Sequence, residues 1–174
     1  MMLMGLLVGS CTQQPSGLNF RVQETYAARV DSVLEMMTLE EKIGQMNQYT
    51  SDFQVTGPSK NDSTKLEQIR KGRVGSMLNV KGAAETRRYQ QKAMKSRLRI
   101  PLLFGLDVIH GMRTVYPIPL AEAASFNLEL MERTASSAAK EAASEGIHWT
   151  FAPMVDITRD ARWGRVMEGA GEDT

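Results

Sequence analysis

The 174-residue chain has few of the residues that metal centres, disulfide frameworks and nucleic-acid surfaces require. It contains one cysteine, Cys11, so no intramolecular disulfide can form. Its two histidines, His110 and His148, exclude a histidine-rich metal site, and no His-Glu-x-x-His pattern or cysteine cluster is present. The formal net charge is only +1, with basic residues spread along the chain. The sequence therefore predicts no metal, no cofactor and no nucleic-acid partner.

The apolar run at the amino terminus, residues 1–9, is too short to cross a bilayer, which takes about 20 residues. It resembles the apolar core of a secretory signal. It leads into Val8-Gly-Ser-Cys11, which resembles the lipobox of bacterial lipoproteins. We therefore expect residues 1–10 to be a signal peptide, Cys11 to be a lipidation site and possible lipid anchor, and residues 11–29 to be a tether and N-terminal segment. A buried strand with a free thiol is the alternative, because no Lys or Arg precedes the run.

The rest of the chain has the composition of a soluble globular domain, with 42% apolar and 24% charged residues. Its length is sufficient for one domain with a core. Basic residues concentrate between Arg87 and Arg99, where we expect the solvated face of a helix rather than a binding patch.

Helical and strand patterns alternate along the chain. A helix is expected over 21–37, and Thr38-Leu-Glu-Glu41 has the capping-box pattern that begins another, with an apolar stripe of Leu39, Ile43 and Met46. Residues 51–64 are polar and contain Gly57-Pro58, which is typical of a loop. Strands are then expected at 74–80, 100–107 and 149–157, and helices at 65–71, 83–97 and 128–145.

The last of these helices is expected to begin at an Asn127 cap and to bury a stripe of small side chains, made up of Met131, Ala135, Ala138 and Ala142. The alternation of helices and strands is typical of parallel α/β units. About three units fit, whereas a closed (β/α)8 barrel takes roughly 250 residues. We therefore predict an α/β fold, the N-terminal part of a (β/α)8 TIM-like barrel that is incomplete in this chain.

Asp107 follows an apolar run directly, which places a carboxylate at the carboxyl end of a strand. Ligands bind at this end in α/β architectures, so Asp107 is a candidate binding residue. Its alternative role is to cap the turn that follows. His110, three residues later, is either a ligand-orienting or proton-carrying group or a hydrogen-bonded structural residue.

A second polar cluster follows the third expected strand, from Asp156 to Arg165 and on to Asp173. Aromatic faces, arginine forks and carboxylates together recognise hydroxylated ligands. Arg165 presents a rigid set of donors that suits neighbouring hydroxyls or a carboxylate. We expect some of these charged residues to pair and fix the loop, while Arg165 faces the ligand.

Four ordered motifs, covering about Val30 to Thr174, resemble the N-terminal domain of glycoside hydrolase family 3. They are Met37-Thr-Leu-Glu-Glu-Lys-Ile-Gly-Gln45, Ile100-Pro-Leu-Leu-Phe-Gly-Leu-Asp-Val-Ile-His-Gly111, Thr114-Val-Tyr-Pro-Ile-Pro119 and Ala152-Pro-Met-Val-Asp-Ile-Thr-Arg-Asp-Ala-Arg-Trp-Gly-Arg165 with the closing Gly-Glu-Asp-Thr174. The likeness places the partial barrel domain at residues 30–174. One departure is Ala161, where relatives commonly have proline.

The resemblance implies a retaining, metal-free glycosidase in which one carboxylate attacks the anomeric carbon and another serves as acid and base. In the family both lie in sequence that would follow Thr174, so no catalytic residue is assigned in this chain. Asp107 and Arg165 match family positions that bind the non-reducing terminal sugar. The resemblance thus implies that these two residues bind substrate and that no residue binds a metal.

The expected parent protein is a β-glucosidase that removes terminal glucose from β-linked gluco-oligosaccharides, located in the periplasm or anchored to the outer membrane of a Gram-negative bacterium. The chain alone is expected to be inactive. The motif Leu106-Asp-Val-Ile-His-Gly111 differs from that of the family's β-N-acetylglucosaminidases and favours the glucosidase branch. A β-xylosidase of the same family and a non-catalytic sugar-binding envelope lipoprotein are the alternatives.

Overall fold

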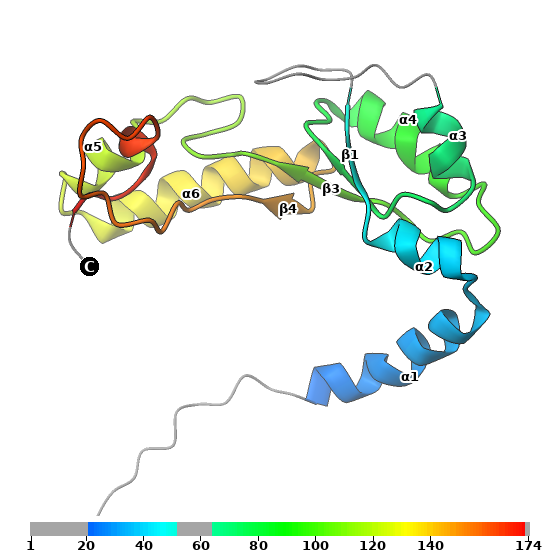
Figure 1. Ribbon diagram of the computed structural model, residues 1–174. Helices are drawn as coiled ribbons and strands as arrows, with labels where there is room; N and C mark the ends of the chain where they lie inside the picture. The colour runs from blue at the N-terminus through cyan, green and yellow to red at the C-terminus, as the bar shows by residue number, and fades with distance from the viewer. Residues whose placement is uncertain (1–20, 52–63, 173–174) are drawn as a thin grey trace, which may run out of the picture. The chain divides into compact units, whose positions relative to one another are not determined.

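The computed structural model describes residues 21–51 and 64–172 (Figure 1). The expected signal peptide, Cys11 and most of the expected loop over 51–64 lie outside the described residues. The chain divides into two units, one up to Met36 and one from Met37 onward. The first contains the helix α1 (Arg21–Met36), which confirms the helix expected over 21–37. No helix in the described ranges has both the length and the apolar character needed to cross a bilayer.

The second unit is built on four parallel strands, β1 (Gln48–Thr50), β2 (Ser76–Leu78), β3 (Leu103–Leu106) and β4 (Trp149–Thr150). Their order in the sheet is β1-β2-β3-β4, so each strand pairs with the next one in sequence. Three of the strands lie within predicted ones, although they are shorter. The prediction missed β1, whose residues Gln48, Tyr49 and Thr50 contain no apolar run.

Helices alternate with these strands as expected of parallel α/β units. They are α2 (Leu39–Gln45), α3 (Lys65–Arg70), α4 (Ala83–Ala93), α5 (Pro119–Ala123), α6 (Leu128–Ser144) and a single 3₁₀ turn, η1 (Val166–Glu168). Figure 1 shows α3 and α4 side by side, and α6 running along β3 and β4. The two short elements α5 and η1 were not predicted, and they flank the polar segments of the candidate site.

One apolar cluster lies between the sheet and the helices. Met77 of β2 and Phe104 of β3 are register partners, and both are almost completely buried. Ile69 of α3, Tyr89 of α4 and Ala142 of α6 pack into the same cluster. Burial of these side chains on folding is the main favourable term that holds three helices on the sheet.

Helix α2 begins as the capping box predicts but buries a different face. The Thr38 hydroxyl accepts from the Glu41 amide at 3.3 Å, and the Thr38 amide donates to the Glu41 carboxylate at 2.9 Å. Glu41 and Gly44 face inward. Gly44 packs so closely on the backbone that a Cβ at this position would lie 2.4 Å from Arg73 Cα. The predicted apolar stripe of α2 points away from the second unit's core, with Leu39, Ile43 and Met46 all exposed.

Helix α6 has the predicted cap and nearly the predicted buried face. The Asn127 side chain accepts from the Leu130 amide at 3.0 Å. Ala138 and Ala142 are buried as expected, whereas Ala135 is exposed and Thr134 is buried in its place. The Thr134 hydroxyl can enter this face because it donates to the Met131 carbonyl at 2.9 Å, within its own helix.

Candidate functional site

The predicted binding residue Asp107 lies immediately after β3, at the carboxyl end of the parallel strands. Leu106 before it and Val108 after it are buried, while Asp107 itself is exposed. The strand therefore fixes the backbone on the core side and leaves the carboxylate free to meet a ligand. This is the placement that the apolar run before Asp107 predicted.

The loop after Asp107 closes into a tight turn between His110 and Tyr116. The Tyr116 amide donates to the His110 carbonyl at 2.8 Å, and His110 Nδ1 lies 3.2 Å from the Tyr116 carbonyl oxygen. Gly111 has φ of +113°, and a Cβ there would lie 1.9 Å from the Thr114 carbonyl oxygen. Only glycine fits this position. His110 therefore has the structural hydrogen bond that was one of its two predicted roles.

The second polar segment follows β4 and folds back on itself through backbone contacts. The Thr158 amide donates to the Gly171 carbonyl at 3.0 Å, and Met154 forms a parallel bridge with Gly169. Within this segment Asp160 and Arg162 form an exposed pair, with Arg162 Nη2 2.6 Å from Asp160 Oδ2. A charged pair of the kind expected in this segment is therefore present.

Arg165 is paired with Glu168 in this segment. Its Nε and Nη2 both donate to Glu168 Oε2, at 2.9 and 2.5 Å. Glu168 raises the pKa of Arg165, and the negative charges of Asp107 and Asp156 add to this effect. Hence the two predicted binding residues lie within electrostatic range of each other, although they come from different strand ends.

Asp156 and Glu168 belong to the polar cluster predicted from the sequence, although neither was given a role of its own there. Asp156 is exposed and follows the apolar stretch that begins at β4, so its sequence signal was the same as that of Asp107. Glu168 lies in η1, three residues after Arg165, and that spacing was the available clue to their pairing. We refer to these four residues, three carboxylates and the guanidinium on which their charges act, as the open mouth.

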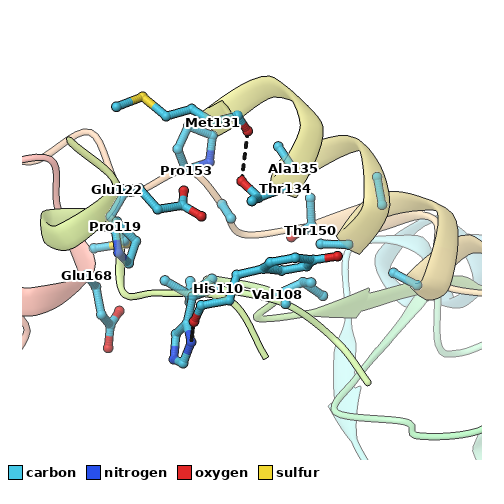
Figure 2. A pocket seen from close by; sticks show the side chains of 18 of the residues that line it. Val108, His110, Pro119, Glu122, Met131, Thr134, Ala135, Thr150, Pro153 and Glu168 are labelled. Atoms are coloured by element: carbon cyan, nitrogen blue, oxygen red, sulfur yellow. Dashed lines mark hydrogen bonds between the residues drawn. The ribbon is translucent and has the colours of Figure 1, made fainter. Parts of the chain in front are cut away.

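A cavity of about 580 Å³ adjoins this mouth, and Glu168 belongs to its lining. Figure 2 shows Thr134 and Ala135 of α6 on one side of it and Val108 and His110 on the other. Its lining is mainly apolar, and neither Asp107 nor Arg165 belongs to it. Sugar hydroxyls need hydrogen-bonding partners, so we place the candidate sugar site at the open mouth rather than in this cavity.

Within residues 21–51 and 64–172, no group of three or more His, Cys, Asp or Glu side chains is arranged to hold a metal ion. The carboxylates and the guanidinium of the mouth can form hydrogen bonds and ion pairs. Exposed carboxylates accept from hydroxyl groups, and a guanidinium donates to them in a fixed plane.

The strand order and the position of the polar side chains together indicate an α/β barrel. Parallel strands that follow one another in order, with polar side chains at their carboxyl ends, are typical of α/β barrels with binding sites at that face. A doubly wound sheet would instead reverse its strand order at a switch point, and no reversal occurs among the described strands.

Residues 38–174 match the family model described as the glycosyl hydrolase family 3 N terminal domain. The chain belongs to this family, and its four strands are part of the family's TIM-like barrel. Over 152 residues it is 44% identical to a periplasmic β-glucosidase of Salmonella typhimurium, an alignment that covers 87% of this chain and 19% of the relative.

Other relatives carry both glucosidase and xylosidase names. A putative β-xylosidase of Formosa agariphila is 33% identical, with 86% of this chain and 22% of the relative covered. The crystal structure of a Listeria innocua β-glucosidase in complex with isofagomine superimposes with a TM-score of 0.74 at 42% identity, covering 84% of this chain and 20% of that chain. The chain thus spans about a fifth of the length of the curated relatives it matches.

Proposed function

We propose that this chain supplies the terminal-sugar subsite of a retaining β-glucosidase. The observation that carries the proposal is the pairing of two features. Asp107 stands at the end of β3 within electrostatic range of Arg165, and the chain is 44% identical to a periplasmic β-glucosidase across most of its length. A Listeria innocua β-glucosidase, 41% identical, has been crystallised with glucose, which supports a glucoside as the substrate class.

In this proposal Asp107 accepts hydrogen bonds from hydroxyls of the non-reducing terminal glucose, and Arg165 donates to the same sugar. Glu168 holds the guanidinium of Arg165 in a fixed plane while part of it remains exposed. The two carboxylates of the retaining reaction come from outside this chain. We accordingly expect the 174-residue chain alone to hydrolyse no β-glucoside.

The first test is the substitution Asp107→Ala in the full-length protein that contains this chain. Two charge-assisted hydrogen bonds to a sugar are lost, so kcat/KM for a nitrophenyl β-glucoside should fall by about 100-fold or more. Asp160→Ala is the matched control, because Asp160 is an exposed carboxylate whose hydrogen bonds in the structure are with Arg162. An Asp107→Ala enzyme within about twofold of wild type would contradict the assigned role.

A β-xylosidase is the second candidate, and the 33% identity to the putative β-xylosidase of Formosa agariphila favours it. Glucose and xylose differ by one hydroxymethyl group on the terminal ring. Comparing kcat/KM for the two nitrophenyl glycosides on one enzyme preparation separates these candidates. We expect the glucoside to be preferred.

The proposed location is the periplasm or the periplasmic face of the outer membrane, with Cys11 as a lipid anchor. The periplasmic name of the Salmonella typhimurium relative supports the compartment. Mass spectrometry of the mature protein, alongside a Cys11→Ser variant, tests the anchor directly. A mature chain that keeps residues 1–10 would contradict it.

A further inference from the structure

The loop that carries Asp107 packs on the core through Val108, Met112 and Tyr116, whereas its outer turn at residues 113–115 is held by polar contacts. At its outer turn Val115 is 75% exposed, and Arg113 and Thr114 are exposed as well. Exposed side chains contribute little apolar burial, so the course of this turn is set by hydrogen bonds and by the positive φ of Gly111.

A single carboxylate of α6, Glu141, accepts three of these hydrogen bonds. Its Oε2 accepts from the backbone amides of Arg113 and Thr114, at 2.8 and 2.9 Å. Its Oε1 accepts from the Thr114 hydroxyl at 2.6 Å. The Thr114 hydroxyl and then the two amides lower the pKa of Glu141, so it is ionised at neutral pH. Hydrogen bonds to an ionised acceptor are stronger than neutral ones.

Two further residues contact the same loop, Ser137 one turn before Glu141 in α6 and Glu145, the C-cap of α6, one turn after it. The Tyr116 hydroxyl donates to Ser137 Oγ at 2.7 Å, and Arg113 Nε donates to Glu145 Oε1 at 2.8 Å. Residues four apart lie on one face of a helix, so this polar row presents three successive partners to the loop. The loop is therefore anchored along α6 from Arg113 to Tyr116.

The opposite end of the loop is anchored by the sheet. Leu106, the residue before Asp107, is buried and is the register partner of Thr150 in β4. Between these two anchors lie Asp107, the buried Val108 and His110. A shift of the 113–114 turn would be transmitted through the His110–Tyr116 contacts toward Asp107.

We propose that Glu141 is a positioning residue for the terminal-sugar subsite, because its carboxylate fixes the loop that holds Asp107 in place. The inference rests on the proposed function of Asp107 and extends it to a residue that needs no contact with the sugar. Nothing in the helix requires a carboxylate at position 141, since the side chain's partners all lie in the loop.

The test compares Glu141→Ala with Glu132→Ala in the full-length protein. Glu132 is an exposed glutamate of the same helix, so it controls for the loss of one negative charge from α6. For Glu141→Ala we expect kcat/KM for the β-glucoside to fall by about tenfold and the inhibition constant for glucose to rise by a similar factor. Glu132→Ala should leave both constants unchanged. Glu141→Gln keeps one acceptor oxygen at the same distance from the backbone, so its loss of kcat/KM should be intermediate. It also serves as the test if the alanine variant folds poorly.

A merely structural role would change other quantities. It would lower the fraction of active enzyme and the melting temperature, while KM and the glucose inhibition constant stayed those of wild type. Hydrogen exchange at the Arg113 and Thr114 amides shows whether the turn has been released. Faster exchange with unchanged KM and inhibition constant would overturn the inference alone. A wild-type protein that neither cleaves β-glucosides nor binds glucose would instead overturn the proposed function, and this inference with it.

Discussion

At the scale of single residues, Arg162 and Arg165 show why similar charges in one segment have different roles. Both donate through Nε and Nη2 to a nearby carboxylate, Asp160 in one case and Glu168 in the other. The side chain of Arg162 is 90% exposed, whereas that of Arg165 is 48% exposed. The negative charges of Asp107 and Asp156 help to raise the pKa of Arg165. Only Arg165 therefore belongs to the polar mouth.

Replacement of Arg165 by lysine is expected to lower kcat/KM for a β-glucoside by about tenfold in the full-length protein. Lysine keeps the charge but lacks the planar fork, so it cannot hold Glu168 and a sugar hydroxyl in one plane. The comparison is Arg162→Lys, which should stay within about twofold of wild type, because an exposed pair contributes little. Equal losses in the two variants would remove Arg165 from the subsite.

Asp107 and Arg165 could be nominated as binding residues from the sequence because each stands in a recognisable pattern, a strand end and a charged family motif. It did not reveal Glu141, whose partners Arg113 and Thr114 lie 28 and 27 residues away in the chain. A glutamate on a helix has no local signal that separates a solvated side chain from one that clamps a distant loop. Such contacts depend on tertiary packing.

At the scale of elements, the start of helix α2 could be predicted from the sequence, whereas its buried face could not. The capping box at Thr38 was predictable, because both partners lie within four residues. The buried face was not, because it is decided by the backbone of Arg73 against Gly44 and by Arg97, which donates to Glu41 through Nε at 3.1 Å and Nη2 at 2.6 Å. Local contacts begin the helix, and long-range contacts orient it.

The Glu41–Arg97 pair makes a testable contribution to the pH dependence of stability. Hydrogen bonds from Arg97 and then from the Thr38 amide lower the pKa of Glu41 below its usual value of 4.5. A carboxyl group with a lowered pKa in the folded state stabilises the protein above its unfolded pKa, and this stabilisation is lost as the pH falls through the folded value. Glu41→Gln should thus cost about 1–2 kcal/mol at pH 7.

Urea unfolding of wild type and Glu41→Gln at pH 7, 5 and 3 measures this contribution. The difference in the free energy of unfolding should be constant between pH 7 and about pH 5 and should shrink toward pH 3. A difference that grew as the pH fell would have the wrong sign for a lowered pKa. Glu85→Gln is the comparison, because Glu85 forms an exposed pair with Arg88 within α4.

At the scale of the whole molecule, the fold class was predictable and the details of the sheet were not. Alternating helical and strand patterns were sufficient to predict parallel α/β units, and the family motifs placed them in a barrel. The strands themselves proved to be two to four residues long. Their ends are decided by pairing with neighbours, as in β4, where only Trp149 and Thr150 of the nine expected residues pair as a strand.

The core joins these short strands into one unit, and Phe104 is at its centre. Phe104 is 1% exposed, pairs in register with Met77 and stacks on His148 with ring centroids 5.8 Å apart. Phe104→Ala would leave a cavity between the sheet and the helices, and should lower the free energy of unfolding by about 3–5 kcal/mol. The same substitution at Phe126, which is 92% exposed, should change it by less than about 0.5 kcal/mol. Chemical unfolding followed by circular dichroism gives both values. Similar values for the two variants would mean that the strands do not share a common core.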